Sequence, residues 1–322
     1  MAPSRPRLLA GAIILAGFLA SPLSASAADN GVIKVVLPVP PGGAGDIIAR
    51  LLTDQVGRLN NRSFVIETRP GAGTMIGTEA VVRSSADGKT LLVNAPFLLI
   101  APHLRKLTFD PLTSLDPVCY LVSSPGVLAV NAASPYRTFA DLMQAVRARP
   151  GQMTFASAGP GTTHHVGFEK LKRDSGLDFI YVPFSGGGPA INALLGSHVT
   201  AVLAEYAPLS EHLKAGTLRP VAVTSTARIP SLPDVPTIGE SYPGFEVDFW
   251  WGLFAPANTP EAFVSQLAQW FTAAMQEPAL KARLNELGFF PAGICGKDFA
   301  MLLRKQYDDY GRVIRGANMR VD

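Results

Sequence analysis

The chain has 322 residues, of which 48% are hydrophobic and 16% are charged, and its formal net charge is +3. This length suits about two domains, and the composition is typical of a globular protein and excludes a disordered one. A net charge this close to zero offers no electrostatic basis for binding nucleic acid or an anionic membrane surface.

The first residues have the pattern of a secretory signal peptide. Arg5 and Arg7 precede an apolar run over 8–20, and small residues at 25–27 follow it, so we expect cleavage after Ala27. The apolar run is too short to span a bilayer. The sequence therefore predicts that residues 1–27 are removed and that the mature protein is exported, without direct membrane insertion.

Strand-like and helix-like segments alternate after this leader. The expected strands are 33–37, 64–67, 90–93, 127–130, a short one around Phe155, 180–182, 201–203 and 221–223. The expected helices are 46–58, 78–84, 138–147, 162–175, 188–195 and 209–215, followed by a mostly helical tail over 261–287 and 297–318. Such alternation predicts an α/β protein with mainly parallel sheets. The proline-rich segment 229–244 is expected to be a surface loop.

Four glycine-rich stretches fall at strand-to-helix junctions, where open α/β sheets bind ligands. They are PVPPGGAGD at 38–46, RPGAGTMIG at 69–77, SAGPGTTHH at 157–165 and PFSGGGPA at 183–190. Glycine lets backbone N–H groups approach a ligand, and a helix N-terminus adds partial positive charge. The loops at 38–46 and 157–165 therefore suit a small ligand with one or two carboxylates. The alternative is that their glycines serve only turn geometry.

None of these stretches matches an enzyme or metal motif. The glycines at 71–77 are spaced one residue too far apart for the dinucleotide fingerprint, and no Walker A lysine is present. Ser157 lies in an incomplete nucleophile elbow. His165 and Glu169, four residues apart on an expected helix, are interpreted as a local polar pair. We expect no catalysis, cofactor or metal, and an exported α/β hydrolase using Ser157 and a histidine is the alternative.

The chain contains two cysteines, Cys119 and Cys295. Export would permit a disulfide between them. Isolated cysteines with apolar neighbours are more often buried and inert, so free thiols are the favoured interpretation. A disulfide is the alternative, because the sequence does not show whether the two cysteines approach each other.

Several motifs together resemble the Bug/TctC family, the extracytoplasmic solute receptors of tripartite tricarboxylate transporters. The resemblance covers about residues 33–322 and is carried by PVPPGGAGDIIAR, ETRPGAGTMIGTEAV, ADGKTLLV, SAGPGTTHHVGFEKL, YVPFSGGGPAINALLG, LKAGTLRPVAVTSTARIPSLPDVPTIGESYPGFEV and WGLFAPANTP. It implies a type II periplasmic binding protein: two α/β domains joined by a two-strand hinge, with the ligand in the cleft. The implied first domain is 28–127 plus 253–322 and the second is 128–252, with crossings near 127–130 and 250–254.

The resemblance also implies partners and ligand contacts. The partners are a small-molecule carboxylate and a membrane permease of the tripartite tricarboxylate type, with the receptor a monomer; a sensor-receptor that feeds a signalling partner is the alternative. Asp46 is expected to shape its loop without touching the ligand. The implied ligand-binding residues are Pro41, Gly42, Gly43, Ala44, Asn94 and Phe97 in the first domain and Ser157, Gly159, Gly161, Thr162, Thr163, His165, Phe184, Ser185, Gly186 and Glu205 in the second.

The chain departs from the family pattern at three places, all of which bear on the ligand. Asn94 to Leu98 is more apolar than usual, Val182 to Gly186 lacks the usual tyrosine and lysine, and Ala204 replaces an aspartate that can read an amino group. These departures disfavour an amino-acid ligand unless Glu205 substitutes. We expect a carboxylate with an apolar or aromatic body that packs on Phe97, Phe184 or Trp250, although these aromatics could equally belong to the core.

Overall fold

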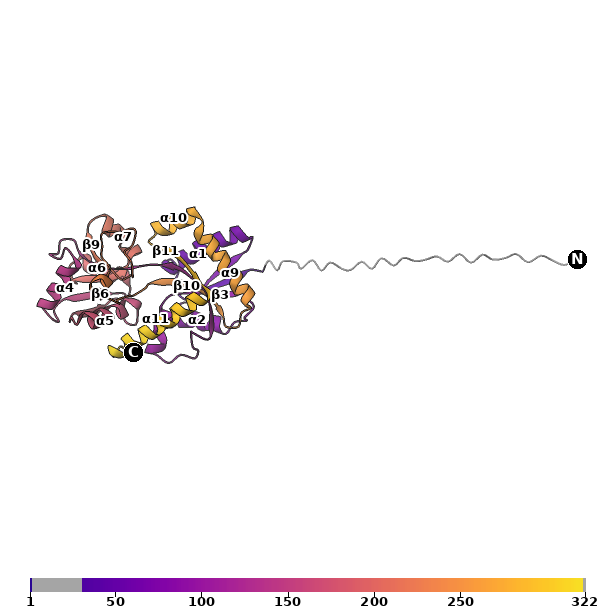
Figure 1. The fold of residues 1–322 in the computed structure, drawn as a ribbon, viewed down its shortest axis with the longest axis horizontal. Coiled ribbons are helices and arrows are strands. Elements are labelled where there is room, and N and C mark those ends of the chain that lie inside the picture. The colour runs from indigo at the N-terminus through magenta and orange to yellow at the C-terminus, as the bar shows by residue number, and fades with distance from the viewer. Residues whose placement is uncertain (2–30, 321–322) are drawn as a thin grey trace. The chain divides into compact units, whose positions relative to one another are not determined.

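The computed structural model describes Met1 and residues 31–320 (Figure 1). The described residues from Gly31 onward form one compact unit. Apart from Met1, the predicted signal peptide therefore lies outside the described residues. None of the helices in the described part is long and apolar enough to cross a membrane.

A six-stranded sheet is built from the two ends of the described chain. Its strands are β1 Ile33–Leu37, β2 Phe64–Thr68, β3 Thr90–Asn94, β4 Leu115–Ser123, β10 Trp250–Pro256 and β11 Phe290–Cys295, in the order β11-β4-β10-β3-β1-β2. With it lie α1 Ala44–Asn60, the 3-10 turn η1 Ala72–Thr74, α2 Met75–Val82, α3 Phe97–Leu104, α9 Glu261–Gln276, α10 Pro278–Glu286 and α11 Gly296–Gly316. In Figure 1 the early segments of the described chain (indigo) and its C-terminal segments (yellow) lie together in this part of the molecule.

A five-stranded sheet is built from the middle of the chain. Its strands are β5 Gly126–Asn131, β6 Thr154–Ser157, β7 Ile180–Pro183, β8 Ala201–Glu205 and β9 Leu218–Val223, in the order β7-β6-β8-β5-β9. The helices of this part are α4 Phe139–Ala148, α5 Thr163–Ser175, α6 Gly187–Leu195, α7 Tyr206–Lys214 and the short α8 Ile238–Ser241. Each sheet has its own buried cores, so the fold has two α/β domains.

Each predicted strand and helix is present, with its ends moved by a few residues. The predicted helix start at Thr138 is confirmed, because its hydroxyl accepts from the Asp141 N–H in a capping box. The sequence patterns did not predict α3, β4, β10 and β11. Two of these elements contain a proline, which argues against a regular helix or strand: Pro102 lies inside α3, and Pro117 lies in β4 beside a shift in its register with β10.

Two expectations about the sheets and loops need correction. The sheets are mixed rather than mainly parallel, because only β1–β2, β1–β3, β6–β7 and β6–β8 pair in parallel. The other five pairings are antiparallel, since β4, β10 and β11 run against their neighbours in one sheet and β5 does in the other. The segment 229–244 is not simply a surface loop: it contains α8 and buries Ile229 and Ile238.

Two chain segments pass between the sheets side by side. One lies between β4 and β5 and the other directly precedes β10. The Ser124 N–H donates to the Phe249 carbonyl at 2.6 Å, which ties the two crossings together. The segments 127–130 and 250–254, near which we expected the crossings, lie inside β5 and β10.

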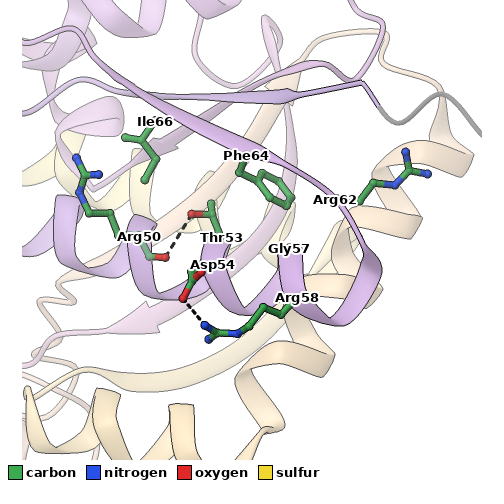
Figure 2. Close-up of a pocket in the computed structure, with 8 residues that line it drawn as sticks. All are labelled: Arg50, Thr53, Asp54, Gly57, Arg58, Arg62, Phe64 and Ile66. Atoms are coloured by element: carbon green, nitrogen blue, oxygen red, sulfur yellow. Dashed lines mark hydrogen bonds and ion pairs between the residues drawn. The ribbon is translucent and has the colours of Figure 1, made fainter.

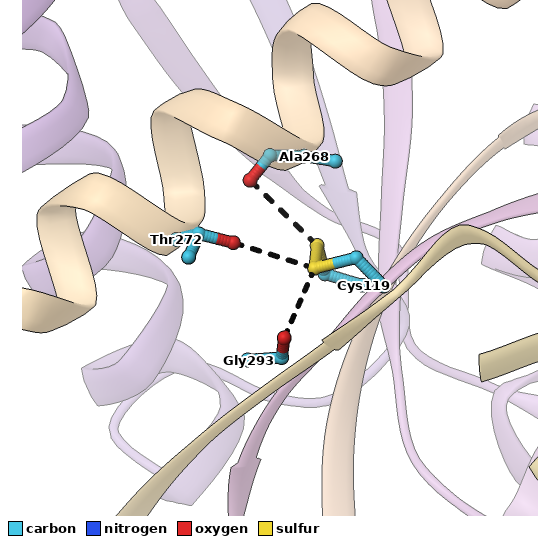
Figure 3. Close-up of a disulfide and its surroundings, with 5 residues drawn as sticks. Cys119, Ala268, Thr272 and Gly293 are labelled. Atoms are coloured by element: carbon cyan, nitrogen blue, oxygen red, sulfur yellow. Dashed lines mark hydrogen bonds between the residues drawn. A yellow bond between two sulfur atoms is a disulfide. The ribbon is translucent and has the colours of Figure 1, made fainter. Parts of the chain in front are cut away.

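A disulfide joins Cys119 on β4 to Cys295 at the end of β11, so the expectation of free thiols is wrong. The two cysteines are register partners on adjacent strands, a relation that only the tertiary fold creates. Figure 3 shows the sulfurs beneath α9, where the Thr272 hydroxyl lies 3.4 Å from the Cys295 Sγ and the Ala268 carbonyl 3.9 Å from the Cys119 Sγ.

Candidate functional site

The principal candidate site is a cavity of about 650 Å³ between loops of the two domains. Its first-domain wall comes from the start of α1, from Phe97 and from the end of α10 with the loop that follows it. Its second-domain wall comes from the loop after β6 with the start of α5, from the start of α6, and from the end of β8 with the following α7. The lining residues are Ala44, Ile47, Phe97, Ala158, Thr162, His164, Gly187, Gly188, Ala204, Glu205, Ala207, Pro208, Ser210, Glu211, Glu286, Leu287 and Phe289.

Asp46 holds the first glycine-rich loop against the start of α1. Its carboxylate accepts from the Gly42 N–H at 3.0 Å and from the Arg50 Nε at 2.9 Å. The hydrogen bond from Arg50, followed by that from Gly42, lowers the pKa of Asp46, so the group is ionised at neutral pH. Asp46 therefore shapes the loop as expected, and it does not line the cavity.

Gly45 allows α1 to approach β10 closely. A Cβ at this position would lie 2.3 Å from the Cζ3 atom of Trp251, a buried residue of β10. The backbone of the first turn of α1 therefore rests on an indole ring that also belongs to the first-domain core. This contact sets where the N–H groups of the turn point.

We expect Gly45→Ala to lower the free energy of unfolding by roughly 1–3 kcal/mol, because the added methyl overpacks the contact with Trp251. Helix propensity alone would give the opposite sign, since alanine is favoured over glycine by about 1 kcal/mol inside a helix. Gly43→Ala is the matched control: the nearest atom lies 3.8 Å from its Cβ position and its φ is −83°. Urea unfolding of both variants checks this, and equal stabilities would show that the Trp251 contact does not limit this position.

The loop between β6 and α5 is held by its own polar groups. The Thr162 hydroxyl donates to the Gly159 carbonyl at 2.7 Å and accepts from the His165 N–H at 3.3 Å, so it caps α5. Gly159 and Gly161 have φ values of +115° and +70°, which disfavour any side chain. The sequence pattern PGTT therefore builds a rigid turn that places the N-terminus of α5 at the cavity.

The two histidines of this turn differ in whether their ring nitrogens have hydrogen-bond partners and in whether they line the cavity. His165 accepts from the Gly161 N–H at 3.2 Å, stacks on Tyr181 and lies 3.9 Å from Glu169, as the predicted polar pair requires. His164 lines the cavity and packs on Phe249, and its buried Nδ1 has no hydrogen-bond partner among the described residues. Burial lowers the pKa of His164 to about 3, so its ring is neutral at physiological pH. The prediction named His165, whereas the structure places the His164 ring in the lining of the cavity; nothing in the HH pair indicates which ring faces it.

Glu205 places a carboxyl group at the end of β8, directly before α7. Its Oε2 accepts from the Ser124 hydroxyl at 2.6 Å, beside the chain crossing. Burial raises the pKa of Glu205, and the hydrogen bond from Ser124 only partly offsets this effect. Glu205 thus links a cavity wall to the segment that joins the domains.

The other residues predicted to bind ligand occupy several different places. Ala44, Phe97, Thr162 and Glu205 line the cavity, whereas Gly161 lines a neighbouring one. Asn94 is fully buried and bonded to Thr78, and Ser157 is fully buried beside the Tyr181 hydroxyl. Pro41, Gly42, Gly43, Gly159, Thr163, His165, Phe184, Ser185 and Gly186 lie outside the lining. Trp250 belongs to the core and donates to Gln306, so the core interpretation applies to it.

A second hollow of about 330 Å³ lies next to this cavity and shares Phe97 and Thr162 with it. It is lined by the first glycine-rich loop, by η1 and α3, and by the loop before α5. Its residues are Pro38, Val39, Pro40, Pro70, Gly71, Gly73, Thr74, Phe97, Ala101, Leu104, Arg105, Pro160, Gly161 and Thr162.

A third hollow, of about 470 Å³, lies between the later turns of α1 and β2 (Figure 2). The three arginines of this hollow each interact with another side chain of the protein. Arg58 pairs with Asp54 at 2.6 Å, and Arg50 pairs with Asp46. Arg62 lies over the Trp270 ring. It is lined by Phe64 at the amino end of β2, whereas ligands of α/β sheets bind at carboxyl ends. The cavity between the domains therefore remains the candidate functional site.

Two α/β domains joined by paired crossings, with helix N-termini around a cavity between them, define a solute-binding protein of the periplasmic type. The model of the tripartite tricarboxylate transporter receptor family, TctC, matches residues 48–319. The chain belongs to this family. The matched family is one of transporter receptors, and the solved neighbour BugD is a periplasmic binding protein, so the chain is a solute receptor and not an enzyme.

Relatives and solved structures cover nearly the whole chain. A UPF0065 protein from the tcbD–tcbE intergenic region of a Pseudomonas species is 33% identical over 88% of this chain and 85% of its own length. Protein BugT of Bordetella pertussis is 32% identical, covering 88% and 89%. The solved structure of the periplasmic binding protein BugD is 29% identical, with a TM-score of 0.75 and coverage of 90% and 99%.

Two solved neighbours contain carboxylates. A protein of R. palustris with adipate is 29% identical to this chain, with a TM-score of 0.78, and the match covers 90% of this chain and 98% of that one. MatC from Rhodopseudomonas palustris with bound malate is 28% identical, with a TM-score of 0.71 and coverage of 88% and 98%.

Proposed function

We propose that this protein captures a small organic carboxylate with an apolar body in the 650 Å³ cavity and presents it to a membrane permease of the tripartite tricarboxylate type. The observation that carries the proposal is the convergence of helix N-termini on the cavity. The starts of α1, α5, α6 and α7 contribute Ala44, Thr162, Gly187 and Ala207 to its wall. Backbone N–H groups at such ends stabilise an anion without a charged side chain.

The charged side chains of the cavity support a ligand held by backbone groups. Among the described residues, no lysine or arginine lines this cavity, whereas Glu205, Glu211 and Glu286 do. A carboxylate therefore finds its favourable electrostatic environment only at the helix N-termini. Glu205 faces the remainder of the ligand, where its carboxyl group would accept a hydrogen bond from a hydroxyl or amino substituent.

The apolar part of the lining supports a ligand with a hydrocarbon body. Four large apolar side chains come from three separate segments of the first domain: Ile47, Phe97, Leu287 and Phe289. The opposite wall adds the smaller apolar side chains of Ala158, Ala204, Ala207 and Pro208. Contact with these side chains removes apolar ligand surface from water, worth about 25 cal/mol per Å². The adipate and malate complexes of the neighbours support the same class of ligand.

We also propose where the mature protein acts and how its domains are arranged along the chain. Residues 1–27 would be removed on export to the periplasm, and the mature chain would act as a monomer. Its domains would be 28–127 plus 253–322 and 128–252, which close on the ligand about the paired crossings. The hydrogen bond between Ser124 and Phe249 supports a hinge at that point.

A thermal-shift screen of unfolded and refolded mature protein against organic carboxylates tests the proposal. A ligand present at about 100 times its dissociation constant stabilises the protein by about 2.7 kcal/mol, which raises the melting temperature measurably. The matched control is the primary amide of each acid that binds, because it keeps the shape and removes the charge. Equal shifts with acid and amide, or no shift with any acid, would contradict the proposal.

A further inference from the structure

A cavity of about 410 Å³ lies beside the chain crossings and shares no lining residue with the main cavity. Its walls come from β4 and β11 of the first domain, from residues 225–230 of the second and from both crossings, and we call it the crossing cavity. Ser124 of the first crossing bonds to Glu205 in the wall of the main cavity, whereas its neighbours Ser123 and Pro125 line the crossing cavity. The first crossing therefore separates the two cavities.

Three charged residues of the described chain line the crossing cavity, and two of them already have partners. Arg228 pairs with Glu240 at 2.7 Å, and Glu246 pairs with Lys305 at 2.7 Å. Within the described part of the chain, no lysine, arginine or histidine forms an ion pair with the third residue, Asp248. When ionised, Asp248 therefore leaves a negative charge in the cavity wall that these pairs do not balance.

Three elements contribute the groups that face Asp248. They are Tyr120 on β4, Glu246 on the segment of Asp248 itself, and Lys305, Gln306 and Tyr310 on α11. The Tyr120 hydroxyl donates to the Asp248 Oδ2 at 2.9 Å. Burial raises the pKa of Asp248 to about 7, although the hydrogen bond from Tyr120 opposes this shift. A cation in the cavity would favour the ionised carboxylate and lower its pKa again.

The remainder of the lining is mostly apolar. Ile229 and Pro230 come from the second domain, and Phe290, Ile294 and Leu302 come from the first. The Ile294 side chain is 40% exposed, so a ligand that covers it would gain from the hydrophobic effect. A Ca²⁺ ion would need about six to eight oxygen ligands, which walls of this kind do not supply. The cavity therefore suits an organic cation with a charged head and a hydrocarbon body.

We propose that the crossing cavity is a second binding site, which takes an organic ammonium ion whose head pairs with Asp248 and whose hydrocarbon body packs on Ile229 and Phe290. An ammonium group has three N–H donors, and an ionised carboxylate accepts such hydrogen bonds strongly. Because Ile229 and Phe290 belong to different domains, the bound ion would contact both domains. The site is independent of the proposed function, since it involves no residue of the main cavity.

Isothermal titration of the mature protein at pH 8 with two matched series tests the proposal. One series is the primary alkylammonium ions from propyl to hexyl, and the other is the alcohols of the same chain lengths. We expect at least one alkylammonium ion to bind with a dissociation constant of about 1 mM or lower, and about tenfold or more tightly than its alcohol. The alcohol keeps the hydrocarbon body and a hydrogen-bond donor but lacks the charge.

The affinity should also depend on pH, because the ion competes with the proton of Asp248. Alkylammonium ions keep their charge between pH 5 and pH 8, as lysine does. Below pH 7 the folded protein holds Asp248 protonated, so the affinity should fall about tenfold between pH 6 and pH 5 and become constant above about pH 8. Titration at pH 6 in buffers of different ionisation enthalpy should show about one proton released for each ion bound.

Asp248→Asn should weaken alkylammonium binding about tenfold or more and abolish the release of the proton. Cooperative urea unfolding verifies that this variant is folded. The control is Asp298→Asn, which removes an exposed carboxylate of α11 that does not line the cavity. This control variant should bind the ion as the wild type does.

Four results would each overturn the second site: no alkylammonium ion bound at pH 8, equal affinity for ion and alcohol, affinity independent of pH, or wild-type affinity in Asp248→Asn. An equal loss in Asp298→Asn would do the same, because it would attribute the effect to the net charge of the protein. None of these results concerns the carboxylate in the main cavity, so the proposed function would stand.

Discussion

Removal of the disulfide between Cys119 and Cys295 is expected to lower the free energy of unfolding by about 5 kcal/mol. The bond closes a loop with a sequence separation of 176 residues, and the chain-entropy relation gives this value for a loop of that length. The bond also fixes β11, an edge strand, to β4 inside the first-domain sheet. The measurement is urea unfolding of the wild type and of the variant Cys119→Ala/Cys295→Ala.

Reduction of the wild type supplies the control for this prediction. A thiol reductant should shift the unfolding midpoint of the wild type toward that of the double variant and leave the double variant unchanged. Thiol titration under denaturing conditions verifies that the bond is open. A wild type with two titratable thiols and an unchanged midpoint would show that the bond contributes nothing to stability.

Asp248 is expected to make the protein less stable as the pH rises from about 4 to about 7. Burial raises the pKa of this carboxyl to about 7 in the folded protein, from an ordinary value of 3.8 in the unfolded chain. Between these values the folded state keeps a proton that the unfolded state releases, so stability falls with rising pH. The upper limit of the loss is about 4 kcal/mol, at 1.36 kcal/mol for each pKa unit.

The groups around Asp248 define its electrostatic environment. The Tyr120 hydroxyl donates to its Oδ2 at 2.9 Å, and the Tyr310 hydroxyl lies 3.5 Å from its backbone carbonyl. Glu246 is close enough to raise the pKa further and is itself paired with Lys305 at 2.7 Å. Asp248 directly precedes Phe249 of the chain crossing.

Asp248→Asn tests this expectation, because it keeps an acceptor for Tyr120 and removes the titration. Relative to the wild type, the variant should gain stability progressively between pH 4 and pH 8 in urea unfolding. Asp54→Asn is the control, since Asp54 lies in an exposed pair with Arg58 that is worth at most about 1 kcal/mol. Parallel stability-versus-pH curves for Asp248→Asn and the wild type would refute the raised pKa.

Local signals in the sequence predicted the elements that carry the main loops. Thr138 and Thr162 begin helices because a hydroxyl can satisfy a free backbone N–H within three residues. Asp46 was predicted to shape its loop, and it does so through Gly42 and Arg50. The α/β class and the position of the glycine-rich loops at strand ends follow from the same local rules.

Local sequence patterns did not predict the contacts between segments that are far apart in the chain. The pairing of Cys119 with Cys295 depends on the register of β11 with β4, and the sequence patterns suggested neither strand. The choice between His164 and His165 depends on which face of α5 meets the cavity, and the burial of Asn94 against Thr78 depends on the packing of α2 on β3. Arg105 lines the second hollow because it directly follows α3, a helix that the sequence patterns did not predict, and contacts η1.

The sequence by itself determined the α/β class, most element positions, the helix-capping residues and the resemblance to a receptor family, because these depend on contacts within a few residues or on contiguous motifs. Only the tertiary structure decided the mixed strand directions, the disulfide, the residues that line the cleft and the buried environment of Asp248. These features arise where segments that are far apart in the sequence meet, as Tyr120 and Asp248 do. Burial and pairing between such segments follow from the packing of the whole chain, which local periodicity does not encode.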